Sequence, residues 1–274
     1  MGALRGNEIQ QVYICSQLNK RLKQLERQGK IAPGKEILVV PTANPYSINV
    51  GNRFWPADNT DINRMFPGYN LGETTQRIAA GIFDAIRHYA YGIHLCSFYM
   101  PGSFLPHVRM MHTGFENLSL ADGFGLPYTV VRNPKPYDTT TLNYNWQIWE
   151  TETFSLYTSE TEKINPESAQ VGVEAILRFM FTQGILLEEP KPGEKNVVKW
   201  EKDMEVIKSE CAGFILPYVS VGKEVEKGEL LAEIIDPYMG EVKKEIVAPE
   251  RGKIFFARNK PMVYANTVLF RIIK

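Results

Sequence analysis

The sequence predicts a mixed α/β domain followed by a small all-β domain. In residues 1–187, short apolar runs alternate with segments whose apolar residues recur at helical spacing. After residue 196 the chain changes to short apolar runs separated by Gly and Pro turns, which is typical of an all-β module. Alternating strands and helices imply a mainly parallel or mixed sheet flanked by helices. We therefore expect domains at 1–187 and 197–274, joined by a charged, proline-containing linker at 188–196.

The first predicted element is a helix that begins after Asn7. Asn7 suits an N-cap, Gly29 suits a C-terminal stop, and apolar residues recur between them at Ile9, Val12, Leu18, Leu22 and Leu25. The run EILVVP at 36–41 is short, apolar and β-branched, so it predicts a strand that is buried on both faces. Residues 43–72 are rich in Asn, Pro and Gly, and a loop of that length is usually functional.

The rest of the first domain alternates in the same way. Helices are predicted at 74–89 and 166–183, and the second begins with a proline, which is favoured in the first turn. Short apolar runs predict four strands, at 91–98, 108–111, 128–131 and 154–157. This pattern does not specify the order of the strands in the sheet.

Composition and charge exclude several classes of protein. The chain has 31 Lys and Arg against 31 Asp and Glu, so no net field attracts nucleic acid or an anionic membrane. Its 3 cysteines lack CxxC spacing, which argues against a disulfide framework and a cysteine-only zinc site. No apolar run has the length of a signal core or a membrane span. We expect a cytoplasmic protein without nucleic-acid or membrane partners.

Four motifs carry a family resemblance. They are RGNE at 5–8, PTANP at 41–45, DINRMFPG at 61–68 and PHVR at 106–109. Together they resemble the aspartoacylase/succinylglutamate desuccinylase family of zinc-dependent deacylases, over essentially the whole chain. The resemblance implies a zinc carboxypeptidase-like sheet and a C-terminal barrel-sandwich module, similar in shape to biotinyl and lipoyl carriers. The nearest hairpin, at 236–240, has no Lys at its tip, so we expect no covalently attached cofactor.

The resemblance also implies a metal site, and this chain differs from the family at its ligands. Family members read HGNE and IDLHS, whereas here Arg5 replaces the first His, and His94 and Cys96 replace the Asp and His of the second motif. Arginine cannot bind a metal. We expect Arg5 to form an ion pair with Glu8 in the place of the metal. Zinc is expected only if Glu8, His94 and Cys96 form a rescued site.

The substrate and proton-transfer residues follow from the same resemblance. The catalytic Glu of the family falls at Tyr157, and Glu160 could replace it or could be a solvated turn carboxylate. Asn63 and Arg64 of the intact DINRMFPG block imply a grip on a substrate carboxylate. Arg64 could instead brace the long loop against the rest of the domain. Arg53 is a weaker candidate for binding the substrate carboxylate. We therefore expect a small carboxylate-bearing ligand.

Three functions remain open. The first is a pseudoenzyme that binds an anion or acts as a subunit, either as a homo-oligomer or paired with an active paralogue. The second is a metal-dependent amidohydrolase that uses the altered ligands Glu8, His94 and Cys96. The third is a thiol hydrolase that uses Cys96 and His94, although residues two apart on a strand seldom give the geometry of a nucleophile and its base. The joint change of the metal and proton residues favours the first.

The RGNE motif lies almost at Met1, whereas the family has strands before it. We expect either a start inside a longer reading frame or a truncated edge of the sheet. A truncated edge would present unpaired backbone groups that another chain could cover.

Overall fold

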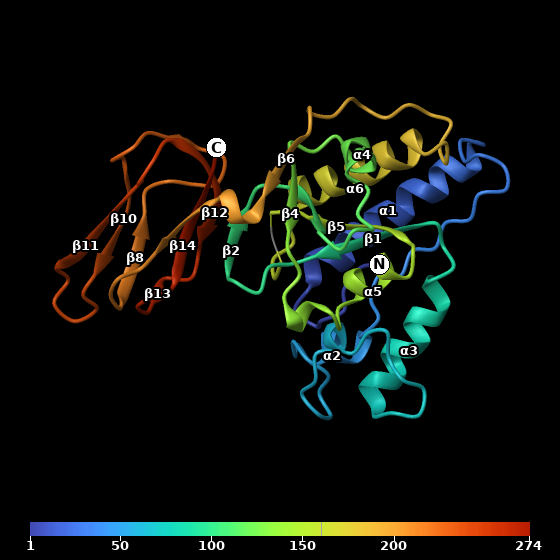
Figure 1. Ribbon diagram of the computed structural model, residues 1–274, viewed down its shortest axis with the longest axis horizontal. Helices are drawn as coiled ribbons and strands as arrows, with labels where there is room; N and C mark the ends of the chain where they lie inside the picture. The colour runs from blue at the N-terminus through green and yellow to red at the C-terminus, as the bar shows by residue number, and fades with distance from the viewer. Residues whose placement is uncertain (160) are drawn as a thin grey trace. The chain divides into compact units, whose positions relative to one another are not determined.

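We analysed a computed structural model of the chain, which describes residues 1–159 and 161–274. The chain divides into two compact units (Figure 1). One comprises residues 1–97 and 106–199, and the other comprises residues 98–105 and 200–274. Within this described part, no helix is long and apolar enough to cross a membrane.

The first unit contains a mixed sheet, as predicted. Its strands lie in the order β1 (Tyr91–Cys96), β5 (Glu152–Tyr157), β3 (His107–Met111), β4 (Tyr128–Arg132) and β6 (Val197–Trp200). β1 pairs with β5 in parallel, and β3 with β4 in parallel, while β3 and β5 are antiparallel. β1 is thus an end strand of the sheet, with β5 on one side only.

The predicted long helices are present as α1 (Ile9–Arg27), α3 (Thr74–Ile86) and α6 (Pro166–Thr182). α1 and α6 pack with the sheet in one buried apolar cluster, whereas α3 belongs to a second cluster. α1 begins one residue later than predicted, because its N-cap position is Glu8 and not Asn7. The connections hold short helices at α2 (Pro45–Asn49), α4 (Leu118–Ala121) and α5 (Leu142–Ile148), and 3-10 turns at η1 (Ile62–Arg64), η2 (Asp122–Phe124) and η3 (Pro136–Asp138).

The strand predicted at 36–41 is wrong. These residues have no regular secondary structure, and Leu38 is 47% exposed. Among the described residues, only the end of this run forms backbone hydrogen bonds. The carbonyls of Val40 and Pro41 accept from the amides of Gly2 (2.8 Å) and Ala3 (2.9 Å). An apolar, β-branched run forms a strand only where another strand lies beside it.

The second unit consists of short strands in the part that the structure describes. One sheet has the order β11 (Val242–Val247), β10 (Leu230–Ile235), β8 (Gly213–Pro217) and β13 (Met262–Val263). The other has the order β2 (Gly102–Phe104), β12 (Gly252–Arg258), β14 (Val268–Ile273) and β7 (Glu205–Lys208), with β9 (Glu224–Val225) also paired to β12. The 3-10 turn η4 (Glu201–Asp203) precedes β7.

One segment lies in a different unit from the one the sequence predicts. Residues 98–105 interrupt the first unit in sequence, but they belong to the second unit. Their strand β2 pairs with β12, so that Phe104 lies opposite Phe256. Local pattern could not show this pairing, because the partner strand is far away in the sequence.

Candidate functional site

Arg5 lies at the centre of a buried ion-pair cluster. Its guanidinium donates from Nη1 to Oε1 of Glu8 (3.0 Å), and from Nη2 to Oδ2 of Asp61 (2.9 Å). Nε also donates to both oxygens of Asp61, at 3.1 Å each. The expected pair of Arg5 with Glu8 is therefore present, and Asp61 adds a second carboxylate. Burial alone would lower the pKa of Arg5, but the two carboxylates outweigh it and raise that pKa.

Both oxygens of Glu8 are committed to hydrogen bonds. Oε2 accepts from the amides of Leu4 (2.9 Å) and Arg5 (3.0 Å), while Oε1 accepts from Arg5 and from the hydroxyl of Ser97 (2.8 Å). Burial would raise the pKa of Glu8, but the charge of Arg5 outweighs it and the pKa is lowered. Glu8 is thus a buried carboxylate that is neutralised by a permanent cation.

His94 and Cys96 lie side by side on β1. The sulfur of Cys96 is 3.3 Å from Nδ1 of His94, and Oδ1 of Asn143 is 3.1 Å from the same nitrogen. The sulfur of Cys96 and the ring of His94 are therefore in contact, although residues two apart on a strand seldom reach such a geometry. Burial lowers the pKa of His94 to about 4 and raises that of Cys96 to about 11. At neutral pH both groups are uncharged, which is the opposite of an activated thiolate with a protonated base.

The predicted ligand set does not fit zinc in this arrangement. Zinc binds deprotonated thiolates and carboxylates with free lone pairs. Here four hydrogen bonds occupy the oxygens of Glu8, and one of them comes from the permanently charged guanidinium of Arg5. Within residues 1–159 and 161–274, no three His, Cys, Asp or Glu side chains gather as ligands for a metal ion.

Tyr157, at the position of the family's catalytic Glu, is held in a buried aromatic environment. Its ring stacks on His107 with ring centroids 4.8 Å apart, and the guanidinium of Arg109 lies 5.0 Å from its ring centroid. Burial raises the pKa of Tyr157 to about 12. This phenol therefore keeps its proton at neutral pH and cannot serve as the base that a Glu supplies. Glu160, the alternative candidate, lies outside the described residues.

The three predicted ligand-binding residues differ in their partners. Arg64 donates to the carbonyl of Tyr137 (2.8 Å), and this contact braces the loop that carries Arg64. Oδ1 of Asn63 accepts from the amide of Leu142 (3.0 Å). Arg53 makes no side-chain hydrogen bond or ion pair within the described chain, although Gly6 donates its amide to the Arg53 carbonyl (3.0 Å). Burial and then the charge of Arg5 lower the pKa of Arg53.

Sequence reasoning missed three residues of this site. Asp61 lies in the DINRMFPG block, so its proximity to the site could have been inferred from that motif. Asn143 lies on α5, whose start is signalled by Thr141 as the N-cap residue, since its hydroxyl accepts from the Tyr144 amide (3.4 Å). Ser97 follows Cys96 directly, but no pattern in the sequence indicates its bond to Glu8.

Comparison with known proteins agrees with the motifs. Residues 1–181 match the model of the succinylglutamate desuccinylase/aspartoacylase catalytic domain. The N-alpha-acetyl-L-2,4-diaminobutyric acid deacetylase of Halomonas elongata is 23% identical over 275 residues, which cover 95% of this chain and 76% of that protein.

Solved structures show the same fold. The succinylglutamate desuccinylase/aspartoacylase from Rhodobacter sphaeroides has a TM-score of 0.79 at 20% identity, covering 99% of this chain and 83% of its own. The product-bound ectoine utilization protein EutE (DoeB) from Ruegeria pomeroyi has a TM-score of 0.78 at 18% identity, with coverages of 99% and 83%. These likenesses establish the mixed α/β fold of the chain.

Proposed function

This chain belongs to the succinylglutamate desuccinylase/aspartoacylase family, and we propose that it binds a small carboxylate-bearing ligand without zinc-dependent hydrolysis. The observation that carries the proposal is the buried pairing of Arg5 with Glu8 and Asp61. The guanidinium satisfies the carboxylates that would otherwise attract a metal ion, and it cannot leave or lose its charge. In this proposal, Glu8 pairs with the guanidinium of Arg5 and not with a metal ion.

Arg53 is the residue that supports anion binding. Its guanidinium is half-buried and lacks a carboxylate partner in the described chain, while Arg5 beside it lowers its pKa. A bound carboxylate would supply the missing charge and a bidentate acceptor. Asn63 and Arg64 follow Asp61 directly and are proposed as further donors to the ligand. We also infer that the first unit is carboxypeptidase-like and that the second is a barrel-sandwich module.

Calorimetric titration with succinate tests the ligand proposal. We expect binding that weakens at least tenfold in Arg53→Gln, because the variant loses the cation that pairs with the carboxylate. Arg77→Gln is the matched control, since Arg77 is exposed on α3 and should leave the affinity unchanged. Equal affinities in the two variants, or no binding of succinate and glutamate to the unmodified protein, would contradict the proposal.

The second candidate is a metal-dependent amidohydrolase, which the similarity to a deacetylase favours. It predicts stoichiometric zinc in the purified protein and chelator-sensitive release of acyl groups from N-acyl amino acids. Cys96→Ala would abolish that hydrolysis if Cys96 were a ligand. Elemental analysis and the same activity assay therefore separate the two candidates, and the finding of both zinc and hydrolysis would overturn the first.

A further inference from the structure

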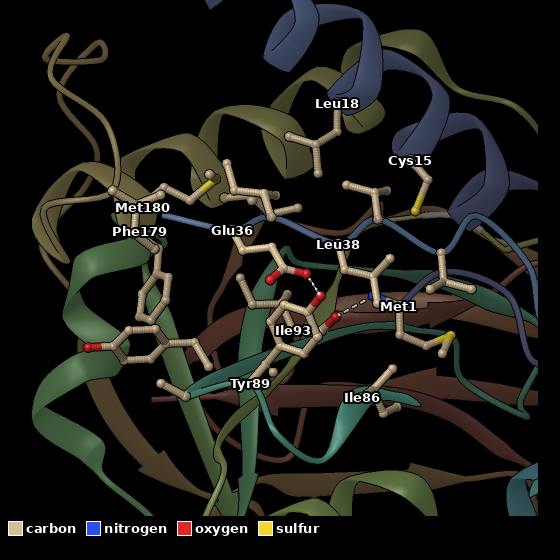
Figure 2. Close-up of a pocket in the computed structure, with 18 of the residues that line it drawn as sticks. Met1, Cys15, Leu18, Glu36, Leu38, Ile86, Tyr89, Ile93, Phe179 and Met180 are labelled. Atoms are coloured by element: carbon tan, nitrogen blue, oxygen red, sulfur yellow. Dashed lines mark hydrogen bonds between the residues drawn. The ribbon is translucent and has the colours of Figure 1, made fainter. Parts of the chain in front are cut away.

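Apolar side chains line a cavity in the first unit and lie on one face of a sheet in the second. The cavity has a volume of about 260 Å³, with Leu38 and Ile93 on its walls (Figure 2). At the same cavity, the hydroxyl of Tyr89 donates to Glu36 (Figure 2). The sheet face belongs to the strands β11, β10, β8 and β13, and it has charged residues at both of its edges.

A row of apolar side chains crosses all four strands of this sheet. In order across the sheet, the row consists of Met262, Phe214, Ile235 and Val242, each directly opposite the next. Directly opposite residues of antiparallel strands point to the same face. Their neighbours Ile215 and Ile234 point to the other face, into the buried core of the unit. The sheet is therefore apolar on both faces, whereas the solvent face of an antiparallel sheet is usually polar.

The apolar row is extended by further side chains. Leu216, which is 47% exposed, lies opposite Glu233 in the next pair on the same face. The hydroxyl of Tyr218 donates to Oε2 of Glu233 (2.7 Å), so its ring lies on this face too. The row, Leu216 and Tyr218 together form the apolar face. With Tyr238 and Met239 of the adjoining β10–β11 hairpin, which are 94% and 73% exposed, it presents on the order of 800 Å², the area that each partner buries in a standard interface.

The β11 side of the apolar face is acidic. Glu245 of β11 lies directly opposite Glu233 of β10, and like charges in this position repel each other. The lysines of β11 already have carboxylate partners, in the pairs Lys243–Asp236 and Lys244–Glu210. Glu245 itself forms no ion pair in the part of the chain that the structure describes. This edge therefore lacks a cation.

The β13 side of the apolar face is basic. Arg258 donates from Nη2 to the carbonyl of Met262 (3.3 Å), so its guanidinium lies at this edge. Burial lowers the pKa of Arg258, and no carboxylate among the described residues pairs with it. Lys260, in the turn that leads to β13, is exposed. This edge therefore lacks an anion.

We propose that the apolar face is the interface of a symmetric dimer formed with a second copy of this chain. Two such faces pack on each other as the sheets of a β-sandwich do, and the apolar rows form the centre of the interface. A twofold axis parallel to the strands places β13 of each copy over β11 of the other. Arg258 and Lys260 of one copy then face Glu233 and Glu245 of the other, and symmetry repeats this contact.

The charges favour a second copy of the chain over an unrelated apolar partner. An unrelated apolar surface would cover Glu245 and Arg258 without supplying their counter-charges, which is costly. The same chain supplies both signs in the order that a twofold axis requires. An axis that runs across the strands would instead place Glu245 over Glu245 of the other copy, so the charges also select the orientation.

Sedimentation of the full chain over a series of concentrations tests the dimer. We expect a monomer–dimer equilibrium whose dissociation constant rises at least tenfold in Phe214→Glu, because the variant places a charge in the centre of the apolar row. Leu71→Glu, at a residue of the first unit that is 84% exposed, is the control and should dimerise like the unmodified chain. Thermal unfolding of both variants checks that the fold survives. A chain that stays monomeric, or a dimer that Phe214→Glu does not weaken, would overturn the proposal.

A charge swap tests the orientation of the two copies. Glu245→Lys and Lys260→Glu should each weaken the dimer about threefold or more, because each places like charges opposite one another across the interface. The double variant restores opposite charges, so its dissociation constant should return to within about twofold of the original. A double variant as weak as the two single changes combined would show that these edges do not meet.

Discussion

At the scale of single residues, burial governs the protonation of His94. Its pKa falls from 6.5 to about 4 because burial outweighs the attraction of Glu8. Between these values the unfolded chain binds a proton that the folded chain does not, so the free energy of unfolding rises with pH. We expect a rise of about 3 kcal/mol from pH 4 to 6.5, which chemical denaturation at a series of pH values would measure.

The variant His94→Gln should flatten this pH dependence between pH 4.5 and 6.5. The window excludes most of the Glu8 contribution, because the lowered pKa of that carboxyl places its titration below 4.5. His88→Gln is the control, since His88 is exposed and lies outside the site. A slope that persists in His94→Gln would show that another group causes it.

The candidate site was only partly predictable at this scale. The motif resemblance identified Arg5 and Glu8, and the chemistry of an arginine beside a carboxylate predicted their ion pair. The partnership with Asp61 was not predicted, because it joins residues 56 positions apart. The contact of Asn143 with His94 likewise depends on where α5 packs, which local sequence does not specify.

At the scale of elements, α1 is tied to the start of α6 by one side chain. Oε1 of Gln10 accepts from the Asn165 amide (2.9 Å), and Nε2 of Gln10 donates to the Asn165 carbonyl (3.0 Å). Gln10 is fully buried. Gln10→Ala should lower the free energy of unfolding by about 2–3 kcal/mol, because it leaves two backbone groups unpaired. Urea denaturation measures this loss.

Two further variants set the scale for that loss. Asn165→Ala removes the N-cap bond to the Ser168 amide (3.0 Å) and should cost about 1 kcal/mol. Gln24→Ala, at an exposed position of α1, should change stability by less than about 0.5 kcal/mol. If Gln10→Ala and Gln24→Ala cost the same, the tie between the helices contributes nothing.

Helices were more predictable than strands for a physical reason. The apolar period and the N-cap of α6 are local features, and Asn165 and Pro166 indicate its start directly. A strand depends on a neighbour that local sequence does not reveal. The run at 36–41 has strand composition, but residues 36–39 make no backbone hydrogen bond between described residues, and no strand forms there.

At the scale of the whole molecule, the assignment of 98–105 to the second unit means that the first unit is not a contiguous piece of chain. Phe98 and Phe104 are buried, with ring centroids 4.7 Å apart, and Phe98 lies 6.1 Å from the ring of Phe256. A fragment of residues 1–199 would keep both phenylalanines and the edge of β2 but lose β12. Exposed aromatic side chains and an open strand edge promote association.

We therefore expect the 1–199 fragment to elute as an aggregate in size-exclusion chromatography with light scattering. The same fragment carrying Phe98→Ser and Phe104→Ser should elute mostly as a defined species, because it lacks the apolar surface that β12 covers in the whole chain. The full-length chain is the reference. A well-behaved 1–199 fragment with cooperative unfolding would show that residues 98–105 do not need the second unit. In that case, residues 98–105 would fold as part of the first unit, as the sequence predicts, and not with the second unit.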